Sequence, residues 1–252
     1  MAATAPAAPL ESDTSALAAD VRPREVWAWS MYDFANSGYT TVVVTAVFSA
    51  YFVGAVAGNA PWATLLWTAS LSISYAAVLA TAPLIGAWAD AHAAKKRLLA
   101  LATVGCAGFT ALLYFAQPGT VALAMALVVA SNFFFSVGEN LIAAFLPELA
   151  SSRAMGRVSG WGWAFGYVGG LVSLGACLAY IQAAEGAPAT SFVPVTMLIT
   201  AAIFAVAAMP TFLFLRERAR PQPAVASPFA RVRQTLAHAA RFRDLRRFLL
   251  CI

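Results

Sequence analysis

The 252-residue chain carries 61% hydrophobic and only 11% charged residues, with a formal net charge of +5. Soluble domains carry about 25% charged residues, so this composition excludes an ordinary water-soluble protein and indicates an integral membrane protein. The positive charge does not indicate a nucleic-acid partner, because the basic residues fall in connections between apolar runs rather than on one folded soluble face.

The first predicted element is a tail at residues 1–25, which consists mostly of alanine, proline and small polar residues. Such a segment cannot bury enough apolar surface to fold alone. It also lacks the basic region that opens a signal peptide. We therefore expect a disordered cytoplasmic tail, followed by a first helix that stays in the membrane.

Long apolar runs follow, and a helix needs about 20 residues to cross the hydrocarbon core. The run at 98–138 is too long for one crossing, and QPGT at 117–120 predicts a turn within it. The runs do not alternate in polarity, which excludes a transmembrane β-barrel. We predict an all-α membrane protein whose residues 26–215 form six transmembrane helices, at 27–57, 62–89, 98–116, 121–146, 158–182 and 192–215.

The first helix carries a polar stripe inside its apolar run. At 100° per residue, four polar side chains share one face, namely Asp33, Asn36, Ser37 and Thr40. An acid within a membrane helix indicates function, because its insertion costs about 2.5 to 3.5 kcal/mol at the bilayer centre. Two interpretations stay open for Asp33: a structural or gating contact near the cytoplasmic side, or direct contact with a solute or proton.

The fourth helix repeats this pattern. Its polar face consists of Asn132, Ser136, Glu139 and Asn140. Two helices three apart in order, each with an acid and an asparagine on one face, would result if spans 1 to 3 and 4 to 6 were inverted repeats that line one cavity. The two acids predict a cavity for a small-molecule solute, with protons as coupling ions.

The fifth helix contains glycines at every fourth residue, Gly162, Gly166 and Gly170. In lipid this spacing lets two helix backbones approach closely. We therefore predict helix packing at these positions, with direct solute contact as the alternative.

After the sixth helix the chain becomes basic. Residues 216–247 predict a cytoplasmic linker with a short amphipathic helix. Residues 248–252, FLLCI, are expected to begin a truncated seventh span.

The basic residues define the expected topology. All 16 lie before the first predicted helix, in the connections after the second and fourth, or after the sixth. The positive-inside rule therefore places both ends of the chain in the cytoplasm. The chain contains only two histidines, and its three cysteines show no paired spacing. We therefore expect no metal site, no cofactor and no enzymatic activity.

Two sequence blocks carry a family resemblance. MYDFANSGYTTVV at 31–43 and FLPELASSRAMGRVSGWGWAFGYVGG at 145–170 resemble the vacuole-effluxer-like branch of the major facilitator superfamily, which includes autophagy-related amino-acid effluxers. GAWADAHAAKKR at 86–97 is similar to the superfamily's loop between helices 2 and 3. The loop matches are Gly86, Asp90, Lys95, Lys96 and Arg97, whereas Ala91 and Ala93 depart from the pattern.

The resemblance implies a secondary transporter of twelve helices, of which this chain supplies the N-terminal six-helix half. The expected partners are the lipid bilayer, a small polar solute such as an amino acid, and the missing C-terminal half. The loop residues would form the inner gate, and helices 1 and 4 would line the cavity. The predominance of arginine over lysine, 14 to two, favours a GC-rich bacterial source and hence an inner membrane. The alternative function is a non-transporting six-helix scaffold or sensor that pairs with a partner.

Overall fold

The computed structural model describes residues 17–18, 20–184 and 186–219, and four single positions beyond them, 237, 241, 242 and 247. Its helical elements are α1 (Pro23–Tyr39), η1 (Thr40–Ala46), α2 (Val47–Tyr51), η2 (Phe52–Val56), α3 (Ala63–His92), α4 (Lys95–Leu112), η3 (Leu113–Phe115), α5 (Val121–Ala143), α6 (Leu146–Leu149), α7 (Met155–Ala183) and α8 (Ala189–Phe214). Outside the described residues lie the predicted tail up to residue 16, the linker from 220 on apart from the four single positions, and the predicted seventh span at 248–252.

Six helices of the described chain are long and apolar enough to cross a membrane, which confirms the all-α prediction and its six spans. The first crossing runs continuously from α1 to the end of η2, and the fourth joins α5 to the short α6. The remaining crossings are α3, α4 with η3, α7 and α8.

The first crossing is less regular than a single α-helix. It begins at Pro23, where the fixed backbone angle of proline suits the first turn. Two segments of it, η1 and η2, are π-helical. The first of these coincides with TTVVVT, six β-branched residues that crowd the preceding helical turn. A π-helical segment widens the helix and is frequent at functional sites, and η1 begins at the last residue of the polar stripe.

The end of the predicted tail makes specific contacts. The backbone N–H of Ala18 donates to Leu149 O at 3.0 Å, next to a bridge between Leu17 and Ala150. The carbonyl of Asp20 accepts a hydrogen bond from Arg218. Residues 17–18 and 20–22 therefore lie against the helices, because residues far along the chain hydrogen-bond to this segment.

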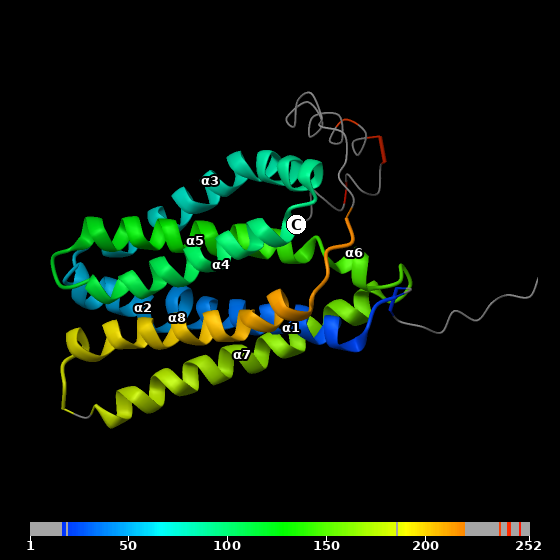
Figure 1. The fold of residues 1–252 in the computed structure, drawn as a ribbon. Helices are drawn as coiled ribbons and strands as arrows, with labels where there is room; N and C mark the ends of the chain where they lie inside the picture. The colour runs from blue at the N-terminus through cyan, green and yellow to red at the C-terminus, as the bar shows by residue number, and fades with distance from the viewer. Residues whose placement is uncertain are drawn as a thin grey trace, which may run out of the picture.

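Helix α1 packs between α7 and α8, α4 packs on α5 and α8, and α3 lies at the outside against α5 (Figure 1). The outer surfaces are apolar: Leu79 of α3, Leu171 of α7 and Leu213 of α8 are among the most exposed side chains. Such surfaces are stable in contact with lipid chains, and the helices satisfy their backbone hydrogen bonds internally.

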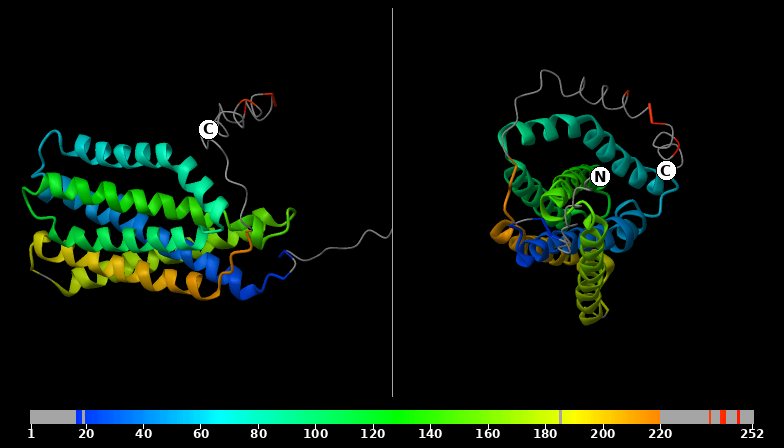
Figure 2. Two further views of the ribbon diagram at one scale, coloured as in Figure 1. Left: turned by 45° about the horizontal axis from the view of Figure 1, so that its top comes forward. Right: turned by 90° about the vertical axis from the view of Figure 1, so that its right-hand side faces the viewer.

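The connections separate to the two ends of the bundle. The α3–α4 connection, α6, the start of α1 and the segment after α8 gather at one end, at the right in Figure 1 and in the left view of Figure 2. The connections before α3, between α4 and α5, and between α7 and α8 lie at the opposite end (Figure 2). The first group carries seven described basic residues, Arg22, Arg24, Lys95, Lys96, Arg97, Arg216 and Arg218, so we call it the charged end.

Candidate functional site

Three aromatic side chains of α1 fix the rotation of this helix. Trp29 Nε1 donates to the carbonyl of Ile142 at 2.9 Å. The hydroxyl of Tyr32 hydrogen-bonds Thr103 Oγ1 of α4, and that of Tyr39 hydrogen-bonds Ser131 Oγ of α5, each at 2.9 Å. All three rings are buried. With this face anchored in the bundle, the polar stripe of α1 turns toward the side where α5 and α7 diverge.

A cavity of about 170 Å³ opens on that side. Its lining comes from three helices and consists of Asp33, Asn36, Ser37 and Thr40 of the first crossing, Glu139 of α5, and Trp163, Gly166 and Tyr167 of α7. All four predicted stripe residues of the first helix therefore meet Glu139 around one space.

A second cavity of about 300 Å³ adjoins the first, because Asp33, Glu139 and Trp163 line both. Asn140 of α5 and Ser159 of α7 belong to its lining. Ala143 and Leu146 extend it toward α6 and the charged end. Six of the eight residues predicted for the cavity thus line the two spaces together: Asp33, Asn36, Ser37, Thr40, Glu139 and Asn140.

Three polar side chains in these cavities, those of Asp33, Asn36 and Glu139, have no partner among the described residues. Within the described residues, Asp33 and Glu139 form no hydrogen bond or ion pair through their side chains. Asn36 is 4% exposed, yet neither its Oδ1 nor its Nδ2 has a hydrogen-bond partner in the described part of the chain. Buried polar atoms nearly always have a partner. The cavities therefore have the character of a site for a ligand or water.

Asn132 and Ser136 differ from the prediction. Asn132 is completely buried, and its Nδ2 donates to Ser74 Oγ of α3 at 3.0 Å. Ser136 is also buried and lines neither cavity. Both share a helix face with Glu139, but α3 packs on α5 at their level and closes that face. Asn132 is therefore a contact between helices in this structure.

The glycines of α7 bring this helix close to α1. A Cβ atom on Gly162 would collide with the Asp33 carboxylate and the Trp29 ring. On Gly166 it would lie 2.7 Å from Ser37 Oγ, and on Gly170 it would lie 2.9 Å from Thr41 Oγ1. The close approach also places Trp163 and Tyr167 beside the polar stripe of α1.

Gly169 approaches α1 more closely than Gly162, Gly166 or Gly170, although the four-residue spacing does not include it. A Cβ atom there would meet the backbone of Phe34, at 2.6 Å from its Cα and closer still to its carbonyl oxygen. A flexible side chain could move aside, but a backbone inside a helix cannot. Gly169 therefore sets the distance between α1 and α7.

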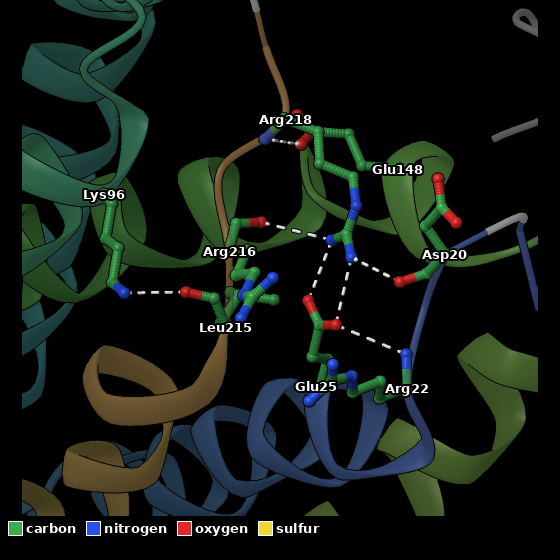
Figure 3. Close-up of polar contacts among 8 residues, drawn as sticks. All are labelled: Asp20, Arg22, Glu25, Lys96, Glu148, Leu215, Arg216 and Arg218. Carbon is green, nitrogen blue, oxygen red and sulfur yellow. Dashed lines mark hydrogen bonds and ion pairs between the residues drawn. The ribbon is translucent and has the colours of Figure 1, made fainter.

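The predicted gating loop belongs to a charged network at the charged end. The Glu217 carboxylate accepts hydrogen bonds from the backbone N–H groups of Lys95 and Lys96, at 2.8 and 3.1 Å. It thus caps the first turn of α4, where a negative charge is favourable. Lys96 Nζ donates to the carbonyl of Leu215 at 2.6 Å, which ties the loop to the segment after α8 (Figure 3).

Glu148, after α5, links this loop to Arg218. It forms an ion pair with Lys95 Nζ at 3.0 Å and accepts the backbone N–H of Arg218 at 2.8 Å. The Arg218 guanidinium forms a fork with both carboxylate oxygens of Glu25, at 2.8 and 3.0 Å (Figure 3). Hydrogen bonding to Glu25 raises the pKa of Arg218, so the guanidinium of Arg218 stays protonated. The network joins α1, α4, α6 and the segment after α8.

The other predicted gate residues have no side-chain hydrogen bond or ion pair with the described residues. The Asp90 side chain forms no hydrogen bond or ion pair with any described residue, and it is half-buried at the end of α3. A Cβ atom on Gly86 would meet no heavy atom within 4 Å, and Arg97 is exposed. Of these three, Arg97 is exposed, whereas Gly86 and Asp90 are half-buried.

Residues 62–251 match the model of the protein family described as Vacuole effluxer Atg22 like. The chain belongs to this family. Its similarity to a curated member of the wider superfamily, the Uncharacterized MFS-type transporter YxiO of Bacillus subtilis (strain 168), is 27% identity over 233 residues. That match covers 88% of this chain and 54% of YxiO, so the chain spans about half the length of the curated relative. The predicted family resemblance is confirmed, and this vacuole-effluxer family chain is an integral membrane protein of the major facilitator superfamily.

Proposed function

We propose that this chain forms one six-helix half of a secondary transporter that carries a small polar solute across the membrane by alternating access, coupled to protons. The observation that carries the proposal is the pair of adjoining cavities in which Asp33, Glu139 and Asn36 have no partner among the described residues. Amino acids are the first solutes to test, because the sequence resembles amino-acid effluxers.

The proposal also accounts for the incomplete cavities and for the Asp90 carboxylate, which is unpaired among the described residues. Among the described elements, the first crossing, α5, α6 and α7 line the cavities, and we propose that a second six-helix half completes them. The half-buried carboxylate of Asp90 supports the same arrangement, since a partner from that half would satisfy it at the inner gate. By the positive-inside rule, we propose that the charged end lies in the cytoplasm. The membrane we propose is a bacterial inner membrane, from the predominance of arginine over lysine.

Exchange of the two cavity acids for their amides tests proton coupling. In proteoliposomes, Asp33→Asn and Glu139→Gln should each reduce proton-driven solute uptake at least tenfold, because an amide preserves the shape but cannot take up and release a proton. The measurement is uptake with and without an imposed pH gradient, using amino acids first and then other small polar solutes.

Asp20→Asn is the matched control, since it removes an exposed carboxylate outside the spans and leaves the backbone carbonyl that Arg218 contacts. Its uptake should equal that of the unchanged protein. Equal uptake and equal response to the gradient in Asp33→Asn and Glu139→Gln would remove both acids as coupling sites. Absence of uptake for every solute would remove the transport proposal itself.

A further inference from the structure

The cavity lining has a charge of one sign. Two acidic side chains, Asp33 and Glu139, line both cavities, and no lysine, arginine or histidine lines either one. Neither acid forms an ion pair with any described residue. Carboxylates that share a space of low polarity repel each other, and a nearby positive charge lowers their energy. A positively charged group is therefore the complement that the lining lacks.

Asn36 shows independently that a ligand belongs here. It projects from α1 between Asp33 and Thr40 and lines the smaller cavity. The residue is 4% exposed, and both polar atoms of its carboxamide are buried without a partner in the described chain. The unmet Oδ1 is an acceptor, which an N–H donor would satisfy.

The wall that α7 contributes to the cavity favours an organic cation over a metal ion. Trp163 and Tyr167 of α7 line the cavity, lie with ring centroids 6.2 Å apart, and expose 66% and 69% of their surfaces. The faces of tryptophan and tyrosine rings attract ammonium groups. A hard metal ion instead requires about six or more oxygen ligands, and aromatic rings supply none.

The volume limits the size of the bound group. A cavity of about 150 Å³ holds a molecule of the size of benzene, and the smaller space here is about 170 Å³. The larger adjoining cavity leaves room for the rest of a solute on the side of the charged end.

From this geometry we infer that the solute of this half is an organic ammonium cation, bound by Asp33 and Glu139 as counter-ions, by Asn36 Oδ1 as an acceptor and by Trp163 as an aromatic wall. The inference rests on the proposed transport function and specifies the substrate class of its site. A zwitterion gains less from this lining, since its carboxylate finds no basic group there, and an anion is repelled.

Three probes that share one branched alkyl chain test the charge preference. 3-Methylbutylamine is a cation, leucine is a zwitterion and 4-methylpentanoate is an anion. Titration calorimetry with the purified protein in lipid nanodiscs should show that the amine binds at least tenfold more tightly than leucine, with no binding of the acid. Asp33→Asn and Glu139→Gln, on different helices, should each weaken amine binding at least tenfold, and Trp163→Leu should weaken it at least threefold.

Trp161→Leu is the matched control, because Trp161 lies on the same helix, is also exposed, at 43%, and lines neither cavity. It should leave amine binding unchanged. Tighter binding of leucine or of the acid, or amine binding that is unchanged in both acid variants, would overturn the inference. Uptake of leucine without amine binding would overturn it while leaving the transport function standing. Amine binding without transport of any solute would support the site and reject the proposed function.

Discussion

Gly169→Ala is expected to lower the yield of folded protein severely and to destabilise what remains. The added Cβ would lie 2.6 Å from Cα of Phe34 and closer to its carbonyl oxygen, so α1 and α7 would have to move apart. Overpacking of this kind costs about 1 to 3 kcal/mol, and a rigid backbone neighbour places this site at the upper end. Separation of the helices would also enlarge the cavity between Asp33 and Trp163. The measurement is the melting temperature and the monodisperse fraction in detergent.

Gly175→Ala provides the control on the same helix. A Cβ atom at Gly175 meets no heavy atom within 4 Å. Alanine is a better helix former than glycine by about 1 kcal/mol, so this variant should be at least as stable as the unchanged protein. Equal melting temperatures for Gly169→Ala and Gly175→Ala would show that α7 does not approach α1 as closely as the structure has it.

Arg218→Gln is expected to cost about 2 to 4 kcal/mol of stability. The variant removes the guanidinium from the Glu25 carboxylate, which is 1% exposed, and leaves it, among the described residues, with backbone N–H donors only, those of Arg22 at 3.3 Å and of Arg216. Removing one partner of a buried pair is strongly destabilising because the other charge stays buried without compensation. The Arg218 side chain is 27% exposed, and solvent reduces the loss accordingly. Chemical or thermal unfolding in detergent measures the effect.

Arg216→Gln makes the same change of charge two residues earlier, at an exposed side chain. Surface substitutions of this kind stay within about 0.5 kcal/mol. The double variant Glu25→Gln with Arg218→Gln should recover part of the loss, since it leaves no unpaired charge. A loss in Arg218→Gln no larger than in Arg216→Gln would exclude a structural role for the network in Figure 3.

Periodicity predicted the spans and the stripe of the first helix because both depend on local spacing alone. The stripe of the fourth helix shows the limit of this reasoning. Spacing placed Asn132 and Glu139 on one face correctly, but whether that face meets a cavity or another helix depends on α3, which covers Asn132 and bonds it through Ser74. The spacing of polar residues along one helix does not show which neighbouring helix will cover its polar face.

Other features escaped prediction for the same physical reason. Trp163 and Tyr167 are not among the predicted site residues, and only the close packing of α7 on α1 places them beside Asp33. The Glu25–Arg218 pair joins residues 193 positions apart. Gly169 was not predicted as a packing residue because the four-residue spacing selects only Gly162, Gly166 and Gly170. The contact with α1 also includes the residue next to Gly170. The sequence offered one signal for the network, the acidic residue Glu25 at the start of the first membrane helix.

Thiol labelling of single cysteines tests most directly whether α1 lines a watery solute site. In a background with the native cysteines replaced by alanine, cysteine at Ser37 should react with a charged, water-soluble thiol reagent, because Ser37 lines the cavity. Cysteine at the buried Asn132 and at the lipid-facing Leu171 should not react. Labelling of Ser37→Cys that exceeds both others, and that a bound amine slows, is the predicted result. Failure of Ser37→Cys to react from either side of the membrane, or labelling of all three at equal rates, would contradict the account.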